Sequence, residues 1–195
     1  MPDRSDAPGA LEDVRTFLNT WSVPNETRVP VDRLSELAGD PETWGSEMPS
    51  LPPPARGGVA ALRRLRDDLR EALGQDRPVS LQPRLDGLRL RALVPHAGGE
   101  GPGGKEPDRD EPDRDEPAVR LVPERPTTQA WLLCVVLEAV RQGQWQRLRA
   151  CPDCRWVFYD SSRNARRTWC SMSAGPGTRG CGSIAKTRTY RARRR

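Results

Sequence analysis

Four cysteines near the carboxyl end of the chain have the spacing of a metal site. They follow the pattern C-x2-C-x15-C-x10-C within 31 residues and are Cys151, Cys154, Cys170 and Cys181. Two cysteines separated by two residues, with further cysteines roughly 15–20 residues later, are typical of zinc sites with four thiolate ligands. Four thiolates complete the tetrahedral shell of Zn²⁺, so we expect one structural zinc ion without an open coordination position.

Three other kinds of chemistry compete with structural zinc. Disulfide bonds are disfavoured because the amino-terminal residues contain no apolar signal-peptide core, and a reducing cytoplasm keeps thiols free. A redox dithiol lies between a strand and a helix, whereas a strand is predicted directly after Cys151-Pro-Asp-Cys154. A catalytic zinc needs an open position and usually a general base, and the single histidine, His96, is remote in sequence. We therefore expect no enzyme activity.

Local elements must hold the cysteines in place. Residues 156–159 and 167–169 are predicted to be the arms of a hairpin with its turn at 161–164, and a helix is predicted from Gly182-Ser183 onward. The expected order is a knuckle, which is the tight turn that holds the first two cysteines, then a hairpin, then a helix with the last ligand at its start. This order is that of a treble-clef zinc finger, which we predict for about residues 146–195. The aromatic side chains expected to form its small core are Trp156, Phe158, Tyr159 and Trp169.

Basic residues gather in the same part of the chain. Residues 141–195 contain fourteen basic and two acidic residues and carry +12; because the whole chain carries +5, the remainder carries −7. This asymmetry is typical of a chain whose basic end binds a polyanion. The candidate nucleic-acid contacts are Arg163, Arg166, Arg167, Lys186, Arg188, Arg191 and Arg193.

Helical patterns dominate residues 1–145. Apolar residues at helical spacing predict helices at 11–18, 31–38 and 62–73, and the most apolar helix is expected at 127–142 as the centre of this domain. Prolines and glycines predict a loop at 45–58. Cys134, within the apolar helix, is expected to be a buried small hydrophobic residue.

A small β-meander is predicted within the same domain. Its strands are expected at 79–81, 88–93 and 118–122, with Asp86-Gly87 as a type I′ turn between the first two. Residues 97–117 contain a tandem Glu-Pro-Asp-Arg-Asp repeat and are predicted to be a disordered insertion, because regular prolines and mixed charges neither form a ladder nor bury a face. The predicted fold class is α+β, with a mostly helical domain followed by the finger.

The carboxyl-terminal segment resembles the bacterial CGNR zinc finger family. The resemblance rests on the knuckle, the aromatic strand, Ser162-Arg-Asn164 and Arg166-Arg-Thr-Trp-Cys-Ser-Met172. The upstream chain resembles the ABATE-type domain through Val14-Arg-Thr-Phe-Leu-Asn-Thr20 and the apolar helix before the finger. The resemblance implies a bacterial transcription regulator with an ABATE-like domain at 1–145 and a DNA-binding finger at 146–195.

Two features depart from the family pattern. The naming motif Cys-Gly-Asn-Arg-Ala-Lys reads Cys181-Gly-Ser-Ile-Ala-Lys186, so Ser183 and Ile184 replace a polar support and a cation. Residues 174–180 also lengthen the spacing before the last cysteine. This insertion is rich in glycine and can loop out without moving the ligand, since the entropy of loop closure changes slowly with length.

The combined features predict a cytoplasmic, nucleoid-associated protein that binds duplex DNA. The longest apolar run has eight residues, against the roughly 20 that span a bilayer, so we expect no membrane association. The amino-terminal domain is expected to bind a small molecule or a protein partner. The residues leave one alternative open, a zinc-finger interaction module that binds RNA or an acidic protein surface.

Overall fold

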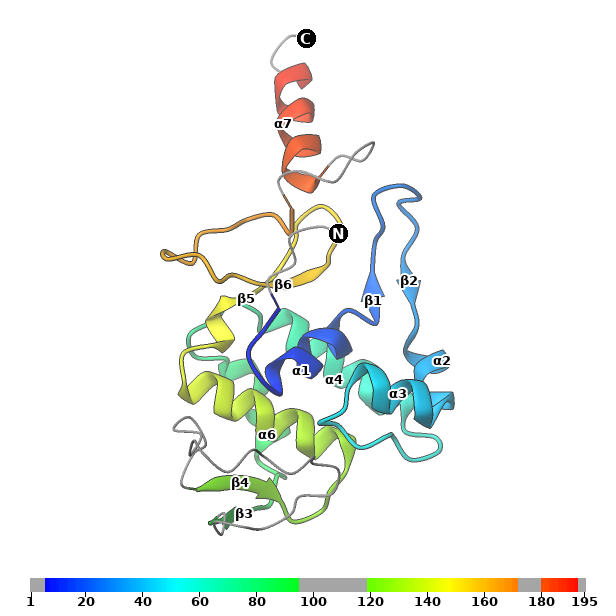
Figure 1. The fold of residues 1–195 in the computed structure, drawn as a ribbon, viewed down its shortest axis with the longest axis vertical. Helices are drawn as coiled ribbons and strands as arrows, with labels where there is room; N and C mark the ends of the chain where they lie inside the picture. Colours follow the sequence, from blue (N-terminus) through cyan, green and yellow to red (C-terminus); the bar gives the residue numbers. More distant parts are fainter. Residues whose placement is uncertain (1–5, 95–118, 172–179, 193–195) are drawn as a thin grey trace, which may run out of the picture.

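The computed structural model describes residues 6–94, 119–171 and 180–192 and has the predicted α+β architecture (Figure 1). Its strands form three separate two-stranded antiparallel sheets within the described residues. The predicted insertion at 97–117, His96 and Arg193 lie outside the described residues. No helix of the described ranges is long and apolar enough to cross a membrane.

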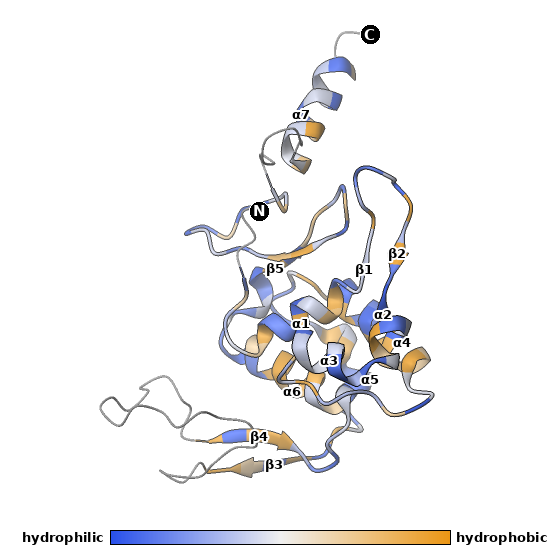
Figure 2. Ribbon diagram, turned by 45° about the vertical axis from the view of Figure 1, so that its right-hand side comes forward, coloured by the Kyte–Doolittle hydropathy of each residue, from blue (hydrophilic) through white to orange (hydrophobic). Residues whose placement is uncertain are grey.

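Three amphipathic helices build the main core. They are α1 (Leu11–Leu18), α4 (Val59–Glu71) and α6 (Thr128–Arg141), close to the predicted bounds. Each helix buries apolar residues at helical spacing, such as Val14 and Phe17 on α1 and Leu65 and Leu69 on α4. The side chain of Thr127 caps α6 by accepting a hydrogen bond from the backbone N–H of Ala130. Figure 2 shows that α6 is mostly hydrophobic, as the prediction of a central helix requires.

Two short helices extend the core. One is shorter than the predicted helix at 31–38, and the other overlaps the start of the predicted loop at 45–58. The predicted helix at 31–38 begins later, as α2 (Leu34–Gly39), because Val31–Asp32 (β2) pairs with Trp21–Ser22 (β1). A further helix, α3 (Pro41–Glu47), starts just before the predicted loop. The Asp40 carboxylate accepts hydrogen bonds from the first free N–H groups of α3, and Pro41 fits the first turn because it has no N–H to leave unpaired.

The predicted β-meander is wrong in its first strand and its turn. Residues Val79–Leu81 form a 3₁₀ turn (η1), followed by α5 (Gln82–Leu85), and Pro83 lies in the first turn of α5. Proline suits that position, whereas in a ladder it would remove a hydrogen-bond donor. The two remaining strands, β3 (Leu90–Leu93) and β4 (Arg120–Pro123), pair antiparallel as a two-stranded ribbon.

The chain then leads from α6 into the cysteine-rich segment. This segment contains η2 (Trp145–Arg147), β5 (Leu148–Ala150), β6 (Val157–Tyr159) and α7 (Cys181–Ala192). Figure 1 shows α7 projecting away from the helices of the main core. Leu148 and Val157 nevertheless belong to the main core, each with 0% of its surface exposed. The first strands of the cysteine-rich segment are therefore packed directly against the amino-terminal helices.

Candidate metal centre

The first two cysteines lie in the turn between β5 and β6. These strands pair antiparallel, with Leu148 opposite Tyr159 and Ala150 opposite Val157. The backbone N–H of Arg155 donates to the carbonyl of Cys151 at 2.9 Å, and Arg155 adopts a left-handed conformation with φ of 60°. This tight turn is the predicted knuckle, and it directs both sulfur atoms toward the same point.

The predicted pairing of the finger hairpin is wrong. Strand β6 pairs with β5, which precedes it, and residues 167–169 form no strand. The buried Asp160 carboxylate explains the difference: it accepts hydrogen bonds from the backbone N–H groups of Ser162 (3.0 Å) and Arg167 (2.7 Å). Burial alone would raise the pKa of Asp160, but these hydrogen bonds and the Ser162 hydroxyl lower it. The carboxylate thus fixes the segment after β6 as a loop.

The four predicted ligands meet at one point. The four Sγ atoms lie within 4.8 Å of one another, with 3.5 Å from Cys170 to both Cys154 and Cys181. A zinc ion about 2.3 Å from each sulfur of a tetrahedron places the sulfurs roughly 3.8 Å apart. Cys181 is the first residue of α7, as predicted, and three of the four side chains are buried. The set therefore fits a four-coordinate zinc ion.

The mutual effects of the thiols on their pKa values are consistent with a site for a cation. Hydrogen bonds from Cys154 and Cys170 lower the pKa of Cys151, whereas the hydrogen bond with Cys151 raises the pKa of Cys154 to about 12. Hydrogen bonds with Cys151 and Cys154 raise the pKa of Cys170. Four thiols this close cannot all ionise unless a positive ion balances them, and metal binding then releases their protons. The site holds one structural zinc ion.

A small apolar core surrounds the sulfur atoms. Phe158 is buried against the cysteines, and Trp156 and Trp169 pack on the same cluster, as predicted. Tyr159 instead packs against the main core. The guanidinium of Arg167 lies 5.2 Å from the centre of the Phe158 ring and donates to the carbonyls of Trp169 (2.9 Å) and Cys170. Arg167 therefore positions the loop that carries the third ligand.

Comparison with known proteins agrees with this geometry. Residues 147–194 match the family model of the CGNR zinc finger. These residues form a CGNR zinc finger. No curated protein and no solved structure matches the chain. The assignment of an ABATE-like domain upstream of the CGNR finger stays a prediction.

The hairpin β1–β2 of the amino-terminal region reaches the metal centre. The Nδ2 of Asn25 donates to the Sγ of Cys181 at 3.0 Å, and the backbone N–H of Val23 donates to the carbonyl of Cys154 at 2.9 Å. The Nη1 of Arg28 lies 3.2 Å from the Oδ1 of Asp153, between the first two ligands. Donors aimed at ligating groups stabilise their negative charge and fix their orientation. The CGNR finger is thus completed by residues more than 120 positions away.

Asp153 also binds the helix of the CGNR finger. Its side chain is 4% exposed, and its Oδ1 accepts a hydrogen bond from the Nη1 of Arg188 on α7 at 2.6 Å. One carboxylate therefore joins the knuckle, the β1–β2 hairpin and α7. A second contact joins α1 to β6: the side chain of Asn19 donates to the carbonyl of Val157 at 2.8 Å and accepts from its N–H at 2.7 Å.

The structure divides the predicted nucleic-acid contacts into two groups. Arg167 and Arg188 form hydrogen bonds with other parts of the protein through their guanidinium groups, although the Arg188 side chain is 58% exposed. The second group is exposed and comprises Arg163, Arg166, Lys186 and Arg191. Two of these lie on the loop after β6 and two on α7, and no ion pair joins any of the four to a carboxylate of the described ranges. On α7, Arg191 is one turn from Arg188 and shares its face, whereas Lys186 lies on another face.

Sequence reasoning missed the polar residues that join the CGNR finger to the rest of the protein. Asn19 lies within the signature at 14–20 and follows the last residue of a predicted helix. The sequence therefore shows a polar residue at a helix end but gives no partner for its side chain. Asn25 and Arg28 carry no periodic or spacing signal. The partners of Asn25 and Arg28 lie 156 and 125 positions away, and the folded backbone alone brings them together.

Replacing Asn25 by alanine should weaken zinc binding without changing the ligand set. The variant loses the donor to Cys181, and loss of such outer contacts typically costs about 10–100-fold in metal affinity. Transfer of zinc to a chromogenic chelator measures the affinity. Glu26→Ala changes the exposed neighbour of Asn25 and should match the unaltered protein. Equal zinc affinities for Asn25→Ala and Glu26→Ala would show that the contact to sulfur has no energetic role.

Proposed function

We propose that the protein is a zinc-dependent DNA-binding protein that regulates bacterial transcription. The observation that carries the proposal is the burial of both acidic residues of segment 141–195, Asp153 and Asp160. The charged side chains that the described part of this segment exposes are basic. A surface of one charge sign attracts a polyanion, and arginine suits phosphate because its planar guanidinium donates in pairs.

The role of zinc in this proposal is structural. Four cysteines fill the coordination shell, so the ion holds the knuckle, the loop after β6 and α7 in a fixed arrangement. The cations on the loop and on α7 then keep their relative positions before DNA binds. We propose no catalytic step, because a closed shell offers no position to a substrate.

The salt dependence of binding to short duplex DNA tests the proposal. If about four or five basic side chains neutralise phosphates, the logarithm of the affinity should fall against the logarithm of the salt concentration with a slope of about −4 to −5. A regulator should in addition prefer one sequence at fixed salt, which DNA co-precipitation across a genome would identify. Binding that does not depend on salt would overturn the proposal.

RNA and an acidic protein surface are the alternative partners. Proteins that read single-stranded RNA stack bases on exposed aromatic side chains. Phe158 is buried in the finger core, and Trp156 and Trp169 pack against it. This arrangement favours duplex DNA over single-stranded RNA. Competition between duplex DNA and single-stranded RNA of equal length distinguishes the two, because the duplex should displace the RNA.

The amino-terminal region completes the proposed regulator. We propose that residues 1–145 are an ABATE-like domain that binds a small molecule or a protein partner, in a nucleoid-associated protein of the cytoplasm. Its contacts with the finger, through Asn19 and the β1–β2 hairpin, give such a partner a physical route to the metal centre.

Restoring the family cation at position 184 should strengthen DNA binding. Ile184 is half-buried near the start of α7, and it is absent from the apolar side chains that pack on either core of the described residues. One further phosphate contact steepens the salt slope by about 0.9, so Ile184→Arg should bind roughly five- to tenfold tighter at 0.1 M salt. Fluorescence anisotropy measures the affinity. The uncharged variant Ile184→Gln should keep the original slope, and a loss of thermal stability in Ile184→Arg without tighter binding would contradict the prediction.

A further inference from the structure

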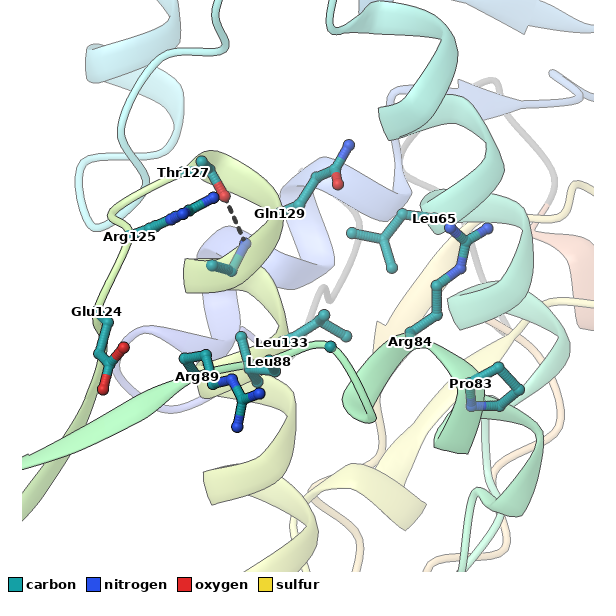
Figure 3. Close-up of a pocket in the computed structure, with 12 residues that line it drawn as sticks. Leu65, Pro83, Arg84, Leu88, Arg89, Glu124, Arg125, Thr127, Gln129 and Leu133 are labelled. Atoms are coloured by element: carbon teal, nitrogen blue, oxygen red, sulfur yellow. Dashed lines mark hydrogen bonds between the residues drawn. The ribbon is translucent and has the colours of Figure 1, made fainter.

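A cavity of about 710 Å³ lies on the side of α6 near its amino-terminal end (Figure 3). Its walls come from α4, α5, the chain that leads into β3, and the segment between β4 and α6. This volume falls within the roughly 300–1,000 Å³ typical of pockets for small molecules. Leu65, Leu88 and Leu133 supply the apolar part of a mixed lining, against which the apolar body of a ligand can pack.

The charged residues of the cavity are mostly cationic. They comprise three arginines, Arg84, Arg89 and Arg125, and one acid, Glu124. Arg84 is already paired, since its guanidinium contacts the carboxylate of Asp68 at 2.6 Å. Neither Arg89 nor Arg125 forms an ion pair with a carboxylate of the described ranges. Two exposed guanidiniums without such a pair therefore make this side of the cavity positive.

The amino-terminal end of α6 adds to this positive potential. Thr127, the cap residue of this 14-residue helix, and Gln129, in its first turn, line the cavity. The Thr127 hydroxyl satisfies the N–H of Ala130, drawn as the dashed line in Figure 3. The helix dipole places a partial positive charge at this end, which favours a negative ligand group within the first turn.

We propose that this cavity binds a small organic anion with an apolar body, such as an aromatic carboxylate. The leucines contact the body, and Arg89 and Arg125 pair with the anionic group. The site is separate from the metal centre, and the proposal is independent of DNA binding by the finger.

Two fluorescent probes of nearly equal shape test the proposal on the full chain. Anilinonaphthalene sulfonate has an apolar body with one anionic group, and N-phenylnaphthylamine is the same body without it. We expect one sulfonate per chain, bound at least about tenfold more tightly than the neutral probe, because a charged hydrogen bond contributes that much. Equal affinity for both probes would overturn the proposal.

A matched pair of variants locates the binding. Arg89→Gln with Arg125→Gln should weaken sulfonate binding about tenfold and leave the neutral probe unchanged. Arg56→Gln with Arg77→Gln removes the same charge at two exposed positions outside the cavity and should leave both affinities unchanged. Circular dichroism confirms that all four side-chain changes preserve the fold. Equal loss of sulfonate binding in the two double variants, or no loss in either, would show that the cavity is not the site.

Discussion

Replacing Cys154 or Cys170 by serine should remove zinc and unfold the CGNR finger. Structural zinc supplies an apparent free energy of about 10–16 kcal/mol to small domains, whereas the described part of the core around the sulfurs contains only Phe158 and two half-buried tryptophans. Elemental analysis should find one zinc ion per chain in the unaltered protein and none in either variant. The helices α1, α4 and α6 should persist by circular dichroism, because their shared core lies outside the cluster.

Cys134 provides the internal control for that experiment. It lies on α6, away from the cluster, and burial raises the pKa of its thiol to about 11. Cys134→Ala should therefore keep a full complement of zinc. Thiol titration gives a second measurement: zinc should protect the four ligands, a chelator should expose them, and Cys134 should react only in denaturant, because the thiolate is the reactive form. A full complement of zinc in both serine variants would refute a four-cysteine site.

Neutralising three exposed arginines of the finger should reduce DNA affinity by about two to three orders of magnitude at 0.1 M salt. The change is Arg163→Gln, Arg166→Gln and Arg191→Gln. Each phosphate contact contributes about 0.9 to the salt slope, so the slope should become shallower by about 2.7. The experiment uses the full chain, because an isolated finger would expose the apolar side chains of Leu148 and Val157 to water. Anisotropy titrations at several salt concentrations measure both quantities.

A triple variant of the same net charge separates a local contact from a general charge effect. Arg56→Gln, Arg64→Gln and Arg77→Gln neutralise three exposed arginines of the amino-terminal region. If the finger holds the phosphates, this variant should keep the original slope, because contacts rather than total charge set the number of released counterions. Equal slopes for the two triple variants would place DNA binding outside the loop after β6 and α7.

Patterns within the sequence predicted the features that depend on neighbouring residues. Helical spacing located α1, α4 and α6, and the cysteine spacing located the cluster together with the start of α7. Helix α3 was missed, although Asp40 and Pro41 are a cap and a first-turn residue of the expected kind. The prolines and glycines at 49–58 indicate a loop, but they say nothing about the helix that ends just before them.

The sequence does not predict the features that depend on residues far apart in the chain. The aromatic residues at 156–159 indicate a strand but do not specify its partner. The carboxylate of Asp160 accepts a hydrogen bond from the backbone N–H of Arg167, so residues 167–169 do not pair with β6, and β5 does. The charge pattern predicted Arg188 as a phosphate contact. The ion pair that engages it became visible only when folding brought Asp153 beside α7.

The single carboxylate of Asp153 makes the hairpin β1–β2 and α7 share one anchor. Arg28 and Arg188 approach the same oxygen atom, so the two guanidiniums share one negative charge. Both elements therefore depend on one side chain, and its loss would weaken the attachment of the hairpin and of α7 together.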